Sequence, residues 1–358
     1  MANPFKFGSI ATGEFFTDRK TEAKEIRSVL ASENHLILIS PRRFGKTSLV
    51  QTIIESEKRP VIQLDLQLIT DVNDFAEQLM KRVLKIKKLE SLKQLIANFR
   101  VIPTVQLDPI TNNMEVSFVP MLKETAAPLL DVLDLINKLG EKGRKPIVVF
   151  DEFQEAANLD ANLLKQMRSV MQHHNNVNYI LLGSAESMMK HIFESKKSPF
   201  YHFGHLMNLK MIPYEDFFEY LSTRLSRVMG NSTPLVESIL SFTACHPYYT
   251  QQLAYYCYFL LEDNVSEEDI FEVAVNTIVE IHSNDFGRLW NTLTKTDKKL
   301  LVTLSMGKSV SASGKPTSTA YSGMKRLVEK GYLLNHGTYE FDDPFFKKWI
   351  IEKRADQA

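Results

Sequence analysis

The N-terminal part of the chain alternates between short apolar runs and longer amphipathic stretches. A run without polar alternation is typical of a strand buried on both faces of a parallel sheet. Such runs lie at residues 36–39, 60–66, 146–150 and 179–182. Apolar residues at helical spacing predict helices at residues 21–32, 48–57, 71–99, 129–139 and 161–173. Strands that alternate with helices predict an α/β fold with a doubly wound, mostly parallel sheet sandwiched by helices.

The pattern changes three times further along. Between Val101 and Pro120 apolar and polar residues alternate, which predicts an inserted β-hairpin with its turn at residues 111–113. Past Pro213 the pattern is helical only and indicates a small bundle, with helices expected at residues 217–228, 234–243, 248–261 and 267–281. The end of the chain predicts a helix, a polar segment, a second helix and a hairpin, which is the order of a winged helix-turn-helix. We therefore predict three domains, at residues 1–212, 213–286 and 287–358, within the two or three expected for 358 residues.

Composition narrows the class of protein. With 44% hydrophobic and 24% charged residues the chain is an ordinary globular protein, and 43 Lys and Arg cancel 43 Asp and Glu. A neutral chain has no overall field that would attract nucleic acid or lipid, so a local patch would have to do so. Its two cysteines fit a reducing compartment. No stretch approaches the ~18 apolar residues of a membrane helix, so we expect a cytoplasmic protein without a membrane partner.

A polar turn follows the first apolar run and reads SPRRFGKTS. Phosphate binding needs consecutive backbone N–H groups, a helix N-terminus behind them and a cation that reaches the outer phosphates. Gly45, Lys46 and Thr47 fill the last three positions of the spacing GxxxxGK[ST], with Lys46 for the phosphates and Thr47 for Mg²⁺. Serine replaces the first glycine, which leaves open a loop that binds no phosphate. The residues that we expect to contact the nucleotide here are Ser40, Pro41, Arg42, Arg43, Phe44, Gly45, Lys46, Thr47 and Ser48.

Two further apolar runs end in polar residues. Asp151 and Glu152 follow the run IVVF, an arrangement that would let Asp151 hold Mg²⁺ and Glu152 deprotonate an attacking water. The alternative is an acidic pair that only ends a strand and caps a helix. Ser184 follows the next run and would lie beside the γ-phosphate, although a plain turn serine competes with that interpretation.

With these residues in place, the chain resembles the archaeal-type ATPase family, STAND-class P-loop ATPases within the wider AAA+ group. The resemblance runs from FFTDR through SPRRFGKTSLV, VVFDEFQEA and LLGS to CHPYYTQQL and DPFFKKWI, and its specific strings are RRFGKTSL and DEFQ. It implies ATP and Mg²⁺ as ligands and a γ-phosphate hydrolysis in which Asp151 is the Walker B metal partner, Glu152 the base and Ser184 the sensor. It also implies that Phe15 and Arg19 border the nucleotide base.

The chain departs from this family at two places. Pro247 matches a proline by which the helical bundle touches the nucleotide, but Cys245 stands where the family has glycine. A simple helix-start proline is the competing interpretation. The family also carries an arginine after the sensor strand, where this chain has His205. A sensing arginine would then have to come from Arg42, Arg43 or Arg168, and Arg168 could equally form a surface salt bridge.

The last segment has a modest basic bias. From Gly287 onward the chain holds thirteen Lys and Arg residues against seven Asp and Glu residues. Lys325, Arg326 and Lys330 lie on the expected recognition helix, which is compatible with DNA phosphate contacts, but winged helices also serve as docking modules.

We therefore expect a slow ATPase that acts as a nucleotide-dependent switch, with ATP and ADP as ligands and a possible protein partner. The alternative is a nucleotide-regulated DNA-binding protein that uses the winged helix. A P-loop kinase is disfavoured because Glu152 follows Asp151 and no arginine-rich lid is evident.

Overall fold

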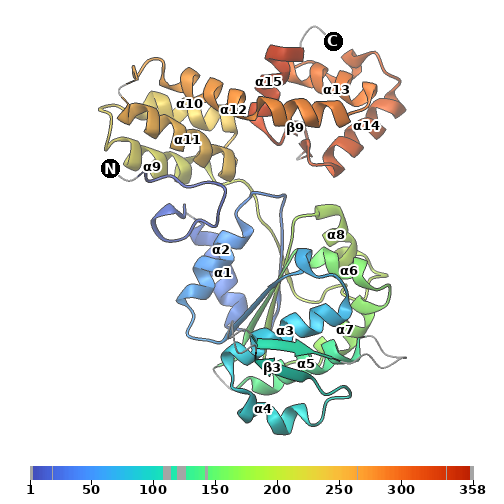
Figure 1. The fold of residues 1–358 in the computed structure, drawn as a ribbon. Coiled ribbons are helices and arrows are strands. Elements are labelled where there is room, and N and C mark those ends of the chain that lie inside the picture. Colours follow the sequence, from blue (N-terminus) through green and yellow to red (C-terminus); the bar gives the residue numbers. More distant parts are fainter. Residues whose placement is uncertain are drawn as a thin grey trace. The chain divides into compact units, whose positions relative to one another are not determined.

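The computed structural model describes residues 3–17, 19–107, 114–118, 126–141, 144–263, 265–335 and 337–354. The chain divides into two compact units, which we describe separately. Residues Arg19–Arg42 and Lys46–Lys210 form an α/β unit, and residues Met1–Asp18, Arg43–Gly45 and Met211–Ala358 form a helical unit (Figure 1).

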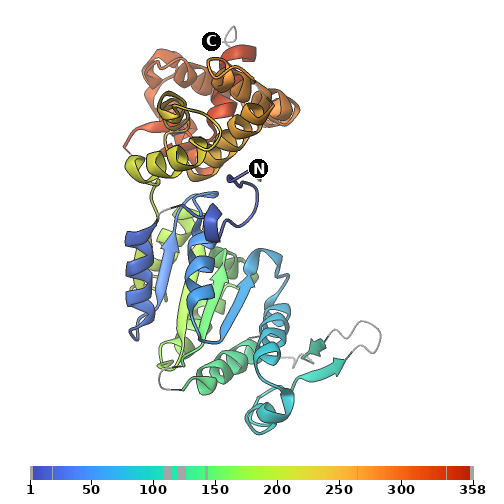
Figure 2. The same cartoon turned by 90° about the vertical axis from the view of Figure 1, so that its left-hand side faces the viewer.

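A five-stranded sheet forms the centre of the α/β unit, and its strand order is β2-β5-β6-β1-β7 (Figure 2). All four strand pairs are parallel, as the alternating pattern predicts. Every residue of β1 and β6 is buried, because both faces of the sheet are covered. The strands are β1 (Leu36–Ile39), β2 (Val61–Asp65), β5 (Ile147–Asp151), β6 (Asn178–Gly183) and β7 (His205–Asn208).

The fifth strand is the one that the apolar pattern does not reveal. β7 reads HLMN and lies at the edge of the sheet beside β1. Both its first and last residues are exposed, and only Met207 is buried. A short edge strand with polar ends carries too little hydrophobic signal to be recognised from sequence.

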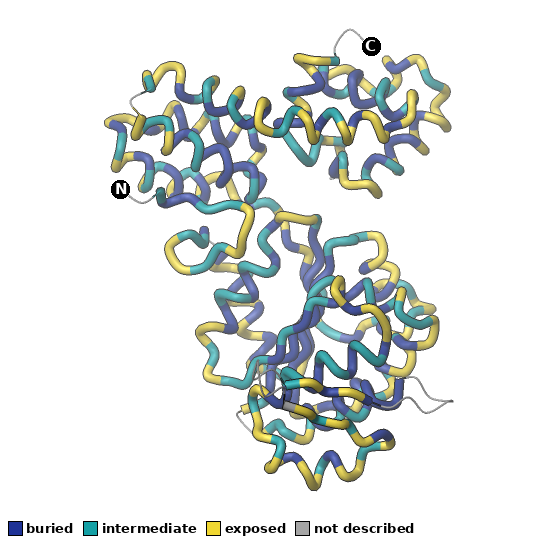
Figure 3. The backbone as a smooth tube through the Cα atoms, in the orientation of Figure 1, coloured by how far each residue is buried: buried dark blue, intermediate teal, exposed yellow. Residues whose placement is uncertain are grey.

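Helices cover the sheet on both faces. Ile37 and Ile39 belong to one core with the apolar sides of α3, α5 and α7. Leu36 and Leu38 point to the opposite face because side chains alternate along a strand. The main helices of this unit are α1 (Lys20–Leu30), α2 (Lys46–Ser56), α3 (Val72–Ile86), α5 (Ala127–Leu139) and α7 (Leu163–Met171), with short helices α6 (Ala156–Leu159) and α8 (Glu186–Glu194). Figure 3 shows the buried strands between their partly exposed helices.

The long helix predicted at residues 71–99 is wrong in one respect. Asp71 caps its start, since its side chain accepts from the Asp74 backbone N–H, but α3 ends at Ile86 and α4 (Leu89–Ile96) follows. Lys87 has an extended backbone. In one continuous helix of about 3.6 residues per turn, Leu92 and Ile96 would face away from the stripe of α3. The break lets both side chains reach the core.

The inserted hairpin is confirmed. β3 (Thr104–Leu107) pairs antiparallel with β4 (Met114–Ser117), and the expected turn at 111–113 lies outside the described residues. Val116 and Phe118 enter the core of the α/β unit, so that the hairpin is attached by apolar packing.

The helical unit has its own hydrophobic core. Its helix α12 runs through the predicted boundary between residues 286 and 287, so the division into a bundle and a C-terminal module stays a prediction. No helix in the described part of the chain is long and apolar enough to cross a membrane. The elements are α9 (Tyr214–Leu225), α10 (Thr233–Thr243), α11 (Pro247–Glu262), α12 (Ile270–Thr292), α13 (Lys295–Ser305), α14 (Thr317–Glu329), β8 (Leu333–Asn335), β9 (Tyr339–Phe341) and α15 (Pro344–Arg354).

Arg326 lies on the helix that we expected to contact DNA, but its side chain forms an ion pair within the helical unit. Its guanidinium donates to the carboxylate of Asp297, which is fully buried at the start of α13. Asp297 also completes a capping box with Thr294. Arg326 therefore ties α14 to α13, whereas Lys325 and Lys330 are exposed.

Candidate active site

The candidate residues meet at the carboxyl edge of the parallel sheet. β1 runs into Ser40, β5 ends at Asp151, and β6 lies between these two strands and runs into Ser184. The Ser40 backbone N–H donates to the Gly183 carbonyl at 3.4 Å, which continues the pairing of β1 with β6 into the loop. Ligands of open α/β sheets bind outside this edge.

Lys46 is the first residue of α2, and its side chain is only 6% exposed. Its Nζ donates to the carbonyls of Ser40 at 3.0 Å and Pro41 at 3.1 Å. Burial lowers the pKa of the Lys46 amine, while the carboxylates of Glu152 and Asp151 oppose that shift. The loop thus holds a poorly solvated cation at a helix N-terminus, where an anion would be stabilised.

Thr47 and Asp151 form a direct contact between α2 and β5. The Thr47 hydroxyl donates to Asp151 Oδ2 at 2.8 Å, and the Glu152 backbone N–H donates to Oδ1 at 2.9 Å. Burial raises the pKa of the Asp151 carboxyl, and these hydrogen bonds oppose the shift. A cation beside this carboxylate would offset the cost of its burial.

Glu152 lies on a strained turn. Its backbone has φ +50°, a left-handed conformation that costs a non-glycine residue about 1–3 kcal/mol. Its Oε2 accepts hydrogen bonds from the Ser184 hydroxyl at 2.7 Å, from the Ser184 backbone N–H at 3.2 Å and from Gln154 Nε2. Burial alone would raise the pKa of Glu152, but the hydrogen bonds from Gln154 and Ser184 and the charge of Lys46 outweigh it and lower the pKa. The carboxylate is therefore held in its basic form.

Gln154 is a site residue that the sequence did not single out. It is 2% exposed, and its Oε1 has no hydrogen-bond partner among the described residues. A Cβ at Gly183 would lie 2.7 Å from that oxygen and 2.3 Å from the sulfur of Met189, so this glycine makes room for both. The string DEFQ contains Gln154 two positions after Glu152, and this is the sequence signal that identifies it.

The residues present fit a Mg²⁺–nucleotide. The Thr47 hydroxyl and the Asp151 carboxylate are hard oxygen donors, and Mg²⁺ is usually held by one or two carboxylates together with phosphates and water. No cluster of three or more His, Cys, Asp or Glu that could hold a metal occurs in the described residues. Gly45 has φ +85°, and glycine adopts this conformation without a steric cost.

The tip of the loop, Arg43–Gly45, belongs to the helical unit. Within that unit Arg43 Nη1 donates to the Tyr249 hydroxyl at 2.9 Å, and its guanidinium lies 4.6 Å from the ring of Tyr248. The ring of Phe44 packs edge-on against His246 at 4.9 Å. The residues that we expected to contact the nucleotide therefore belong to both units. Those in the α/β unit are Ser40, Pro41, Arg42, Lys46, Thr47 and Ser48.

Phe15 and Arg19 also fall in different units. The Phe15 carbonyl accepts from the Tyr220 hydroxyl and from Gln251 Nε2, both at 3.2 Å, within the helical unit. Arg19 is buried in the α/β unit, where it donates to Glu22 at 2.9 Å and to the Lys210 carbonyl at 2.8 Å. Their role at the nucleotide base stays a prediction.

Pro247 is the first residue of α11. Cys245, two residues before it, has φ +58°, so it adopts the conformation for which glycine is the usual residue. The chain therefore carries a side chain at a position whose backbone conformation favours glycine.

His205 lies at the opposite edge of the sheet from the loop, since it pairs with Leu36 at the start of β1, and it contacts Glu25 at 2.6 Å. Arg168 donates to the Pro199 carbonyl at 3.1 Å and stacks 5.0 Å from the Phe203 ring, and it has no salt bridge to a described residue. Arg42 is exposed, and its charge lowers the pKa of Lys46. Of the three candidate arginines, Arg42 is the one whose charge acts on Lys46.

The comparisons with known proteins agree with this geometry. The chain is similar over its length to a Walker-type ATPase of Pyrococcus abyssi, with 16% identity, a TM-score of 0.67 and coverage of 97% of this chain and 99% of that one. It is also similar to the ORC2 protein of Aeropyrum pernix, solved as ADPNP and ADP complexes, with 13% identity, a TM-score of 0.58 and coverage of 97% and 98%. No curated protein matches. A family model described as an ATPase domain predominantly from Archaea matches residues 16–253, and the chain belongs to this family.

Proposed function

We propose that this protein hydrolyses ATP in a Mg²⁺-dependent reaction at the carboxyl edge of its sheet. The observation that carries the proposal is the contact of Thr47 with Asp151 at 2.8 Å, next to Lys46 and Glu152. The family membership and the fold of P-loop ATPases support it.

Each residue has a defined task in this proposal. Bound Mg²⁺–ATP would supply the phosphoryl group and neutralise its developing charge. The Lys46 ammonium binds phosphate oxygens in place of the Ser40 and Pro41 carbonyls that it now contacts. Thr47 and Asp151 hold the metal through their oxygens.

Glu152 takes a proton from the attacking water. Its Oε2 already accepts three hydrogen bonds, and no described residue donates to Oε1. Oε1 is therefore the atom that accepts the proton, while Ser184 and Gln154 keep the carboxylate oriented. A lowered pKa weakens this base but keeps it ionised, which suits a slow ATPase.

We further propose that the nucleotide acts as a switch of the STAND type. The resemblance implies that Pro247 and Phe15 of the helical unit contact the nucleotide, and in that case ATP and ADP would bias the arrangement of the units differently. A protein partner would respond to that difference.

The test compares steady-state ATP hydrolysis and nucleotide binding in three variants. Lys46→Ala should lose binding or hydrolysis, and Glu152→Gln should keep ATP binding and lose turnover by about 100-fold or more. Glu155→Gln is the matched control, because it makes the same change in the same segment at a side chain that bonds only Asn158 among the described residues. Equal rates in the wild type and Glu152→Gln would refute the assignment of the base.

Nucleotide-regulated DNA binding is the second candidate. It is favoured by the order of α13, a 3₁₀ helix at Val310–Ser313, α14 and the β8–β9 hairpin, which is the order of a winged helix. The pairing of Arg326 with Asp297 removes one of the three cations that we expected on the recognition helix. Binding to duplex DNA with a steep salt dependence would select this function, and absence of binding at low salt would remove it.

A further inference from the structure

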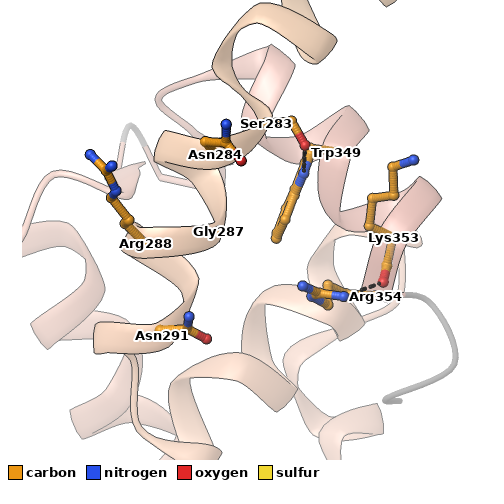
Figure 4. Close-up of a pocket in the computed structure, with 8 residues that line it drawn as sticks. All are labelled: Ser283, Asn284, Gly287, Arg288, Asn291, Trp349, Lys353 and Arg354. Atoms are coloured by element: carbon orange, nitrogen blue, oxygen red, sulfur yellow. Dashed lines mark hydrogen bonds between the residues drawn. The ribbon is translucent and has the colours of Figure 1, made fainter.

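A polar pocket of about 450 Å³ lies in the helical unit between α12 and α15 (Figure 4). It is lined by Ser283, Asn284, Gly287, Arg288, Asn291, Trp349, Lys353 and Arg354. The α12 residues Asn284, Arg288 and Asn291 recur at helical spacing, so they present their side chains on one face. The lining contains three cations and no acidic side chain.

The floor of the pocket is a packed aromatic cluster. Trp349 is 2% exposed, and its ring lies 6.0 Å from Phe346 and 6.2 Å from Trp290. Its indole N–H donates to the Ser283 hydroxyl at 3.1 Å, which joins α15 to α12. The helices that carry the polar side chains of the pocket are therefore closely packed against each other, so the pocket cannot easily close.

The donors of the pocket are under-used. Arg354 stacks on the Trp349 ring at 4.9 Å, and its Nε is buried without a hydrogen-bond partner among the described residues. Arg288 contacts Asp285 at 3.6 Å, but both side chains are largely exposed, so an anion could replace this pair at small cost. A buried donor without an acceptor is rare in folded proteins, and an oxygen of a bound anion would supply the missing acceptor.

We propose that this pocket binds the phosphate group of an organic phosphate, at a site separate from the residues of the P-loop. Arg288, Lys353 and Arg354 supply the positive charge, and Asn284 and Asn291 supply additional donors. A phosphate dianion offers three terminal oxygens and matches guanidinium forks. The volume of about 450 Å³ exceeds the needs of a bare phosphate and falls within the usual range for organic ligands.

The chain provides a direct reporter of this site. Its only two tryptophans are Trp290 and Trp349, one in the floor of the pocket and one packed against it. Tryptophan emission can therefore be titrated in the full-length protein with pyrophosphate, and separately with a short 5′-phosphorylated oligothymidylate, at constant ionic strength without Mg²⁺. Pyrophosphate represents a free phosphate compound, and the oligonucleotide represents a nucleic acid strand.

We expect saturable changes in emission with at least one probe, and the tighter probe identifies the source of the phosphate. Arg288→Gln with Lys353→Gln should weaken that binding by about tenfold or more, because two charge-assisted contacts are lost. The matched control is Lys325→Gln with Lys330→Gln, which removes the same charge from two exposed positions at the C-terminal end of α14 and should leave the affinity unchanged. The signal should also persist in Lys46→Ala.

Three results would overturn the site. The wild type could show no saturable change with either probe. Both double variants could lose affinity equally, which would mean nonspecific attraction to a basic surface. Lys46→Ala could abolish the change, which would assign the signal to the P-loop.

Discussion

Asp151 and Glu152 are adjacent in the chain, yet their surroundings shift their pKa values in opposite directions. Burial dominates at Asp151 and raises its pKa, whereas Gln154, Ser184 and the charge of Lys46 overcome burial at Glu152 and lower it. In the proposed reaction, a bound cation would offset the burial of Asp151, and the ionised Glu152 would accept a proton. The left-handed turn at Glu152 directs its side chain toward the end of β6 and away from Asp151.

The hydrogen bonds to Glu152 predict a change in the pH dependence of turnover. Removing a donor in Ser184→Ala or Gln154→Leu should raise the pKa of Glu152, so the acid limb of kcat against pH moves to higher pH. Ser184→Thr keeps the hydroxyl and serves as the control. Steady-state rates between pH 4 and pH 8 give the limb, and an unchanged limb in both donor variants would show that these groups do not tune Glu152.

Cys245 predicts a measurable backbone effect. Its φ of +58° is unfavourable for a side chain with a Cβ and most unfavourable for a β-branched one. Cys245→Val should therefore lower the free energy of unfolding by about 1–3 kcal/mol relative to Cys245→Gly. Urea denaturation of both variants tests this, and equal stabilities would mean that the turn before α11 relaxes.

Most residues of the candidate site could be predicted from the sequence, because they either match the spacing of a phosphate-binding loop or directly follow an apolar run. Lys46, Thr47, Asp151, Glu152 and Ser184 lie where these signals put them. Gln154 could not be assigned, because its importance depends on a contact to Oε2 of Glu152 that only the turn creates.

Among the elements, the hydrophobic pattern identified the strands that are apolar almost throughout and the helices that have one apolar face. β1, β5 and β6 are apolar at every position but their ends, and α5 has a continuous buried stripe. The same rule failed where tertiary packing decided the outcome. We expected one helix over residues 71–99, but α3 and α4 are separate because Leu92 and Ile96 lie off the stripe of α3 and reach the core only after a change of direction.

The ion pair of Arg326 with Asp297 joins α14 to α13, so we expect a substitution of Arg326 to lower the stability of the helical unit. Arg326→Ala would leave the fully buried Asp297 without its cation, so the free energy of unfolding should fall by about 2–3 kcal/mol at pH 7. Burial would raise the pKa of Asp297, but its hydrogen bonds to Arg326 and Thr294 lower it in the wild type.

The effect of Arg326→Ala should also depend on pH. Without Arg326 the raised pKa lets Asp297 take up a proton as the pH falls, which relieves the uncompensated charge. The wild type keeps its pair, so the difference in urea unfolding free energy should be smaller at pH 4 than at pH 7. Lys325→Ala is the control on the same helix, and a loss as large in that variant would rule out a specific role for the Arg326 pair.

On the scale of the whole molecule, the described residues of each unit form a hydrophobic core that contains no residue of the other unit. Units with separate cores are expected to unfold in two transitions, which calorimetry can resolve. A ligand that binds only one unit stabilises that unit alone, by about 2.7 kcal/mol at a concentration of 100 times its Kd.

This reasoning separates a switch from simple nucleotide binding. If ATP engages Lys46 of the α/β unit and Pro247 of the helical unit together, a non-hydrolysable ATP analogue with Mg²⁺ should raise both transition temperatures. ADP should raise chiefly the transition of the α/β unit, and Lys46→Ala should abolish both shifts. A shift confined to the α/β unit with the analogue would refute the switch while leaving nucleotide binding intact, because linkage requires that only units in contact with the ligand, or coupled to it, gain stability.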